Sequence, residues 1–259
     1  MILCLTNLSY KNLSFNNFLS EVKKINSTNI EVAPSLLHKK PHLTQNINKI
    51  ISLLEREKIK IQSFQSVFYN ARKINIENKK DFDYLIFYFK KIINLADKLG
   101  VKNLSIGSCP SRRFHYNQSF QEHFNVLLFR NFSKIAYKKD IIISVEPVSQ
   151  KYNNFFLINI NEALLFIKKV NKKNIKLVLD TGNCKSEKIN YRNFFIKYKR
   201  YINHIQLSDS NLNNLNINSI KKELKFFYKN NFKKTLTIEY FSNNGKKKFI
   251  LPKIIKNYI

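Results

Sequence analysis

Side chains that can hold a metal ion end four consecutive β-branched segments in the second half of the chain. Glu146 follows Ile-Ser-Val, Asp180 follows Leu-Val-Leu, and Glu239 follows Leu-Thr-Ile; the segment before Glu239 carries His204 and Gln206. A lone carboxylate at a strand end is usually solvated, but three that converge in a partly desolvated space repel one another unless protonated or held by a cation. Three carboxylates with one amide oxygen or imidazole suit Mg²⁺ or Mn²⁺, with Co²⁺ and Zn²⁺ as further candidates. We therefore expect one divalent metal ion here.

Alternation along a strand predicts which way these side chains face. Ser144 and Glu146 share one face of their segment, and Thr237 and Glu239 share one face of theirs, opposite to aliphatic residues. The aliphatic face should pack on helices, which leaves the polar face directed to the interior of the fold.

The elements that must position these residues alternate between short strands and longer amphipathic helices, in eight cycles. Such alternation implies parallel pairing, and eight cycles in 259 residues predict an α/β fold, a single (β/α)₈ TIM barrel over residues 1–259. An open doubly wound sheet is the alternative, but no GxGxxG motif follows the first strand. The expected strands are Ile2–Asn7, Asn29–Ser35, Ile59–Phe68, Asn103–Gly107, Asp140–Pro147, Ile175–Gly182, Ile202–Ser208 and Thr235–Phe241. The expected helices are Asn16–Ile25, Thr44–Lys58, Lys80–Leu99, Gln118–Lys138, Asn161–Val170, Tyr191–Lys199, Ser219–Lys229 and Lys246–Asn257.

Composition narrows the class of protein. With 44% hydrophobic residues the chain can bury a large core, and no run of eighteen apolar residues predicts a membrane span. The first residues read as a strand and not as a signal peptide. Cys4, Cys109 and Cys184 lie far apart and form no CxxC, so we expect free thiols in a reducing compartment and a cytoplasmic location.

The net charge of +29 is mostly lysine, spread from Lys11 to Lys256. A nucleic-acid site is typically an arginine-rich patch with exposed aromatic residues, and this scatter fits a compositional bias toward Lys, Asn and Ile instead. We expect no specific nucleic-acid partner and no membrane partner, whereas an oligomer is compatible with the sequence.

Seven short motifs, in this order and spacing, make the chain resemble the xylose isomerase-like TIM barrel superfamily. The motifs are Ile30-Glu-Val-Ala-Pro, Gln62-Ser-Phe-Gln-Ser, Leu99-Gly-Val, Ile106-Gly-Ser-Cys-Pro-Ser-Arg-Arg, Val145-Glu-Pro, Leu179-Asp-Thr-Gly and Ile205-Gln-Leu-Ser-Asp. The superfamily includes sugar phosphate isomerases and epimerases, hydroxypyruvate isomerases, inosose dehydratases and endonuclease IV-type DNA repair enzymes. The resemblance implies that Glu146, Asp180, Gln206 and Glu239 bind the metal, with Gln206 similar to the hydroxypyruvate isomerase pattern.

The resemblance also implies a reaction on a small carbohydrate. The metal would chelate a carbonyl and a neighbouring hydroxyl of an open-chain sugar or sugar phosphate, and Glu146 and Glu239 would serve as base and acid around an enediolate. A dehydratase or lyase on the same metal site is the alternative, because it begins with the same proton abstraction. An endonuclease IV-like enzyme fits less well, because that site is rich in histidine and this chain has 5. A catalytically idle barrel is a further alternative.

Five more residues are expected to contact substrate. Gln65 ends the third strand, His204 lies two residues before Gln206, and Asn183 stands where the superfamily often has histidine. The adjacent Arg112 and Arg113 could clamp a phosphate or carboxylate, or could be ordinary surface charges.

Overall fold

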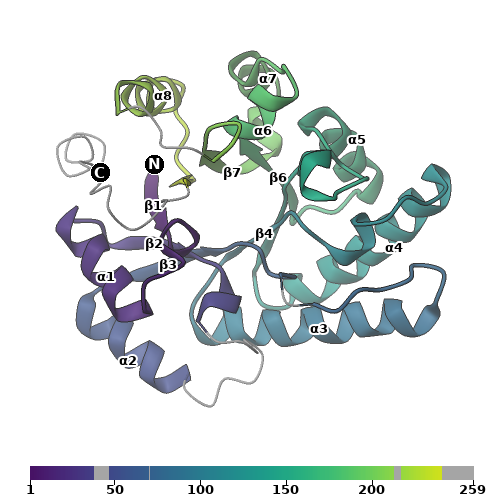
Figure 1. Ribbon diagram of the computed structural model, residues 1–259, viewed down its shortest axis with the longest axis horizontal. Coiled ribbons are helices and arrows are strands. Elements are labelled where there is room, and N and C mark those ends of the chain that lie inside the picture. The colour runs from purple at the N-terminus through teal and green to yellow at the C-terminus, as the bar shows by residue number, and fades with distance from the viewer. Residues whose placement is uncertain (38–46, 70, 213–216, 241–259) are drawn as a thin grey trace.

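A closed barrel of eight parallel strands forms the centre of the molecule, with each strand paired to the next and the last to the first (Figure 1). The computed structural model describes residues 1–37, 47–69, 71–212 and 217–240. This is the (β/α)₈ barrel that the sequence predicts. Its strands are β1 (Ile2–Thr6), β2 (Asn29–Val32), β3 (Lys60–Phe64), β4 (Asn103–Ile106), β5 (Ile142–Val145), β6 (Ile175–Asp180), β7 (Ile202–Leu207) and β8 (Thr235–Ile238).

Helices surround the barrel, and at least one follows each of the first seven strands (Figure 1). The helix expected over Lys246–Asn257 lies outside the described residues. No helix within the described ranges has both the length and the apolar character needed to cross a membrane. The α-helices are α1 (Phe15–Lys24), α2 (Ile47–Glu57), α3 (Lys79–Lys98), α4 (Gln118–Tyr137), α5 (Ile160–Val170), α6 (Thr181–Ser186), α7 (Tyr191–Tyr198) and α8 (Ile217–Lys229).

Asparagine, which is abundant in this chain, begins several of these helices. The side chains of Asn78, Asn117, Asn159 and Asn190 each accept a hydrogen bond from a backbone N–H in the first turn of α3, α4, α5 and α7. Ser14 does the same for α1. Such caps satisfy donors that the helix itself leaves unpaired, and they mark where each loop at the mouth of the barrel ends.

Apolar packing between the barrel and the helices forms the main core. Phe89 of α3 stacks on Phe132 of α4 with ring centroids 4.1 Å apart, and Phe68 stacks on both rings. Cys4, Cys109 and Cys184 are buried and unpaired, as expected for free thiols.

The interior of the barrel is polar. Asn103 of β4 donates to Ser63 of β3 at 2.8 Å and accepts from Ser144 of β5 at 2.6 Å and from Asn203 of β7 at 2.9 Å. These bonds join side chains of four strands inside the barrel. Asn103, Ser63 and Ser144 face the interior as the alternation predicts, whereas Asn203 departs from it, because its neighbour His204 also points inward.

Candidate functional site

A cavity of about 310 Å³ opens at the carboxyl ends of the strands. Residues that follow each of the eight strands line it, from Leu8 after β1 to Glu239 after β8. In (β/α)₈ barrels the loops at this end carry the chemistry, and the volume is within the range that holds a small ligand. The cavity is therefore the first place to look for an active site.

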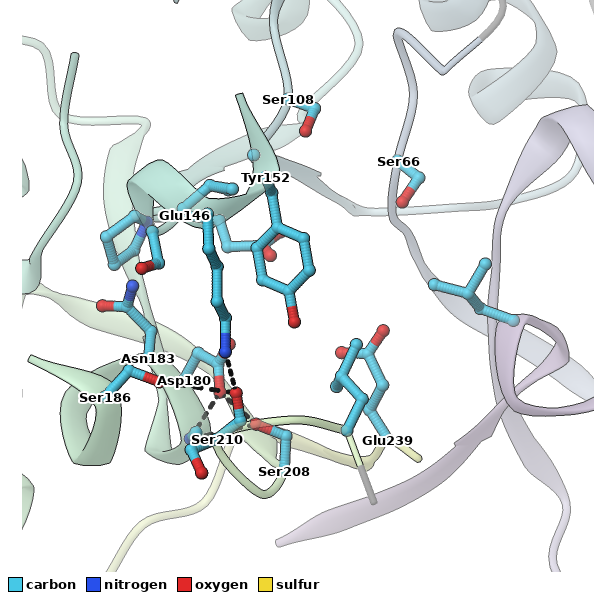
Figure 2. A pocket seen from close by; sticks show the side chains of 18 of the residues that line it. Ser66, Ser108, Glu146, Tyr152, Asp180, Asn183, Ser186, Ser208, Ser210 and Glu239 are labelled. Atoms are coloured by element: carbon cyan, nitrogen blue, oxygen red, sulfur yellow. Dashed lines mark hydrogen bonds between the residues drawn. The ribbon is translucent and has the colours of Figure 1, made fainter. Parts of the chain in front are cut away.

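The three carboxylates predicted as metal ligands line this cavity together with Asp209, whose Oδ1 lies 3.8 Å from Lys185 Nζ (Figure 2). Glu146 directly follows β5, Asp180 is the last residue of β6, and Glu239 directly follows β8. Glu146 and Asp180 are half-buried, whereas Glu239 is only 5% exposed. The fold thus brings the three predicted acidic residues to one hollow.

Asp180 is held in place by its neighbours. One carboxylate oxygen, Oδ1, accepts a hydrogen bond from the Gly182 backbone N–H at 2.8 Å and another from the Ser208 hydroxyl. A Cβ atom on Gly182 would lie 2.6 Å from the Asp209 carbonyl oxygen, so only glycine lets the start of α6 approach the loop after β7 this closely. These contacts fix the orientation of the Asp180 carboxylate at the edge of the cavity.

Glu146 packs against Gly107, which directly follows the neighbouring strand β4. A Cβ atom on Gly107 would lie 2.9 Å from Glu146 Oε2, which is closer than ordinary van der Waals contact. Gly107 therefore provides the space that the Glu146 carboxylate occupies beside the end of β4.

Burial and mutual repulsion raise the pKa of all three carboxyls. Burial is the main cause for Glu146, whose pKa rises to about 8, and the charges of Asp180 and Glu31 add to it while Arg112 opposes it. The pKa of Glu239 is raised well above its usual range by burial and by the neighbouring carboxylates. Burial also raises the pKa of Asp180, against the lowering effect of its hydrogen bonds. A cluster of this kind favours either bound protons or a bound cation.

Gln206, the fourth predicted ligand, lies fully buried in β7 and is not part of the cavity wall. Its Cα is paired with Asp180 on one side and Thr237 on the other. The side-chain Nε2 donates to Gln65 Oε1 at 3.1 Å, while Oε1 has no hydrogen-bond partner among the described residues. A buried carbonyl oxygen left in this way costs about 1–3 kcal/mol, so a ligand for it is to be expected.

The chemistry of these four residues fits a divalent cation. They supply three carboxylates whose charges a cation would neutralise and one neutral amide oxygen without a partner. Within the described ranges, however, no three His, Cys, Asp or Glu side chains are already grouped as metal ligands. Binding of one ion by all four residues stays a prediction.

The prediction that Arg112 clamps a phosphate or carboxylate of the substrate is wrong, because this side chain is completely buried. Burial lowers the pKa of Arg112 to about 10, which leaves it charged at neutral pH, and its charge is directed to peptide oxygens rather than to a substrate. Arg113 is half-buried, donates to the Ser108 carbonyl at 3.4 Å and does not line the cavity. The acceptors of Arg112 are the backbone carbonyls of Ile106, Gly107, Glu146, Phe156 and Leu157, at 2.5 to 3.4 Å.

Two other expected substrate contacts also lie away from the cavity wall. His204 is buried inside the barrel, where its Nε2 is 3.2 Å from Glu31 Oε1 and 3.1 Å from Thr237 Oγ1. The charge and hydrogen bonding of His204 bring the pKa of Glu31 below its usual value despite the opposing effect of burial. Gln65 is buried at the end of β3 and contacts Gln206 rather than the cavity.

Asn183 does line the cavity, as expected for a substrate contact. Its Nδ2 donates to the Ile158 carbonyl at 2.9 Å, and its Oδ1 has no hydrogen-bond partner among the described residues. The free oxygen can accept a hydrogen bond from a hydroxyl group in the cavity.

Sequence reasoning missed several residues at the site. Ser208 lies two residues after Gln206 on the same face of the chain, so the alternation that found Gln206 could also have found it. Lys151 and Tyr152 lie in a short 3₁₀ turn that carries no periodic pattern. Lys151 crosses to the loop after β7, where its Nζ donates to the Ser210 carbonyl and to Asn211 Oδ1 at 3.2 Å.

Comparison with known proteins gives a consistent result. The family model described as "Xylose isomerase-like TIM barrel" matches residues 19–253. Compared by sequence with curated proteins, the chain matches none of them.

Solved structures with a similar fold include a sugar epimerase, a zinc-containing protein and a probable dehydratase. A D-psicose 3-epimerase crystallised in the presence of D-fructose has a TM-score of 0.78 at 16% identity, over 99% of this chain and 89% of that one. The IolI protein with a zinc atom has a TM-score of 0.71 at 17% identity, over 100% and 95%. The probable 3-DHS dehydratase AsbF from Bacillus anthracis has a TM-score of 0.75 at 14% identity, over 99% and 98%.

Proposed function

The chain belongs to the xylose isomerase-like TIM barrel family, and on that premise we propose that it is a metal-dependent isomerase or epimerase of a sugar or sugar phosphate. One observation carries the proposal. Glu146 and Glu239 border the same cavity, and burial raises the pKa of each. Structures of the same fold include a D-psicose 3-epimerase, which supports a sugar as the substrate class.

Glu146, Asp180, Gln206 and Glu239 are the residues that would hold the metal ion. A divalent ion bound there would polarise a carbonyl and a neighbouring hydroxyl of an open-chain sugar and so acidify the hydrogen on the carbon between them. The zinc atom in the similar IolI structure supports a metal in this fold, and Mn²⁺ or Mg²⁺ best suits the oxygen ligands of this chain.

Proton transfer is the task of the two glutamates. One, as a carboxylate, takes the proton from the substrate carbon, and the other, as a carboxylic acid, returns a proton to the opposite face of the planar enediolate. In the metal-free protein burial raises the pKa of both groups, which makes each a stronger base when ionised than a solvated carboxylate, and a bound cation would lower the pKa again. The same pair could serve in either direction of the reaction.

The rest of the cavity suits a polyhydroxylated substrate. Asn183 and several serines offer hydrogen bonds to hydroxyl groups, and Leu8, Leu36 and Val148 are apolar parts of the wall that exclude water from the reacting carbon. Lys151 lines the same cavity and supplies positive charge that an anionic group of the substrate could contact. Whether the natural substrate is phosphorylated is decided by the experiment below.

Exchange of carbon-bound hydrogen with solvent tests the proposal. The purified protein, loaded with Mn²⁺ or Mg²⁺, is incubated in D₂O with a panel of ketoses and ketose phosphates, and deuterium at the carbon next to the carbonyl is followed by NMR. We expect metal-dependent incorporation into at least one sugar together with its isomer or epimer. Loss of a hydroxyl group from the product would instead favour a dehydratase, which the similarity to AsbF makes the second candidate. A panel that shows no exchange with either metal would contradict both.

A further inference from the structure

A chain of hydrogen bonds runs across the barrel interior below the cavity and ends at Gln206. Gln65 is 2% exposed, its Oε1 accepts from Gln206 Nε2 at 3.1 Å, and its own Nε2 donates to the hydroxyl of Thr6. The Thr6 hydroxyl oxygen also accepts from the Leu8 backbone N–H at 3.1 Å. Residues at the ends of β1 and β3 are thereby linked to Gln206 near the end of β7.

In this structure the directions of these hydrogen bonds leave one end of the Gln206 amide without a partner among the described residues. The Leu8 N–H can only donate, and in this structure the Thr6 oxygen accepts both from it and from Gln65 Nε2. Gln65 therefore presents its oxygen to Gln206, and Gln206 presents its NH₂ group to Gln65. The Gln206 oxygen is the atom left without a partner among the described residues, in β7 beside Asp180.

We infer that Gln65 is a positioning residue that keeps the Gln206 carboxamide oxygen free to bind the metal ion, an inference that rests on the proposed function. An amide binds a cation through its oxygen and not through its NH₂ group, so a Gln206 side chain turned by 180° would be a repulsive neighbour instead of a ligand. Gln65 does not touch the cavity and holds this orientation from behind. This positioning role takes the place of the substrate contact that the sequence predicted for Gln65.

The experiment measures how tightly the protein, first freed of metal, binds Mn²⁺, because this affinity does not depend on turnover. Free Mn²⁺ is counted by electron paramagnetic resonance during titration of the full chain. Gln65→Met keeps the length of the side chain but removes both hydrogen bonds, and Gln65→Glu keeps an acceptor for Gln206 Nε2. Gln121→Met is the matched control, because Gln121 is also 2% exposed but donates to the Ser111 and Phe114 carbonyls beside α4.

We expect Gln65→Met to bind Mn²⁺ about 10- to 100-fold more weakly than the wild type, the usual effect of removing a partner of a metal ligand. Gln65→Glu should bind at least ten times more tightly than Gln65→Met, and Gln121→Met should bind like the wild type. Thr6→Val, which removes the acceptor of Gln65 Nε2, serves if Gln65→Met does not fold, and it should also weaken binding.

Equal affinity of Gln65→Met and the wild type would overturn the inference while leaving the proposed function intact. Equal weakening by Gln121→Met would also overturn it, because any loss of a buried glutamine would then have the same effect. A wild-type protein that binds no Mn²⁺ would contradict the proposed metal site itself, and the role of Gln65 with it.

Discussion

Glu146 and Glu239 are unlike most carboxylates at strand ends because they share a confined space with each other and with Asp180. Each is surrounded by groups that oppose its ionisation, and the pKa of each rises as a result. In the proposed reaction these two groups would carry the proton to and from the substrate carbon. Their roles can be tested by changes that keep shape and remove only the ionisable proton.

Glu146→Gln and Glu239→Gln should each lower the deuterium exchange rate about 10³-fold or more, because general acid–base catalysis typically contributes two to four orders of magnitude. The circular dichroism spectrum should be unchanged. Glu223→Gln is the matched control, since Glu223 is a buried glutamate that pairs with Arg192 away from the cavity. Exchange retained in both site variants would contradict the assignment.

Stability of the metal-free protein should fall as the pH rises from about 5 to about 8. The pKa of Glu146 is about 8 in the folded protein and near its ordinary value when unfolded. Between these values the unfolded state binds fewer protons, so the free energy of unfolding decreases with pH. Urea denaturation at pH 5 and pH 8 measures this, and the expected loss is about 1 kcal/mol or more.

The variant Glu146→Gln supplies the control for that measurement, because it cannot titrate. It should lose less stability than the wild type between the two pH values. An unchanged fall in the variant, or a wild-type protein that gains stability toward pH 8, would contradict the role given to Glu146.

At the scale of the elements, Arg112 joins the loops that follow β4 and β5. Its guanidinium donates to carbonyls on both loops, among them those of Gly107 and Glu146, so it fixes the backbone that carries the proposed catalytic glutamate. Arg112 thus stabilises two loops of the protein and does not bind a phosphate, contrary to what the pair of arginines suggested. Removing the Arg112 side chain should therefore lower the free energy of unfolding.

Arg112→Met should lower the free energy of unfolding by about 3 kcal/mol or more, because several buried carbonyls lose a charged donor. Arg113→Met is the natural control and should change it by less than about 0.5 kcal/mol. Chemical denaturation of the two variants under the same conditions gives both numbers. Arg112→Met as stable as Arg113→Met would contradict the structural role.

Alternation and order along the chain predicted the strands well, and with them the faces of Glu146, Asp180, Gln206 and Glu239. The eight expected strands all occur, but several end earlier than expected; β3 ends at Phe64, and Ser66 then has a positive φ of 51°. A periodic pattern indicates the face of a residue and not its depth. His204 lies two positions before Gln206, about 6–7 Å further from the mouth, so it faces the axis correctly but lies too deep for substrate.

The role of Arg112 could not be predicted in the same way. Its carbonyl partners come from its own loop and from residues up to 45 positions away, and no local pattern in Cys109-Pro-Ser-Arg-Arg indicates that one arginine is buried and the next is not. The orientation of the Gln206 amide depends similarly on Thr6 and Gln65, which become neighbours only when the barrel closes. Contacts of this kind follow from the fold and not from sequence periodicity.

At the scale of the molecule, closure of the barrel is what creates the site. β1 pairs with β8, and only then do Glu239 after β8 and Leu8 after β1 border the same cavity. The net charge of +29 contributes little to this arrangement, since the side chains closest to the proposed reaction are acidic. An excess of lysine on the whole chain and an acidic centre coexist because the barrel separates its interior from its surface.

Anomalous X-ray diffraction from a crystal soaked in Mn²⁺ tests the central claim most directly, because it locates the ion and its ligands together. We predict one strong peak at the mouth of the barrel, with oxygen atoms of Glu146, Asp180, Gln206 and Glu239 at about 2.0–2.3 Å. A peak bound by other residues, or no peak at this end of the barrel, would contradict the account.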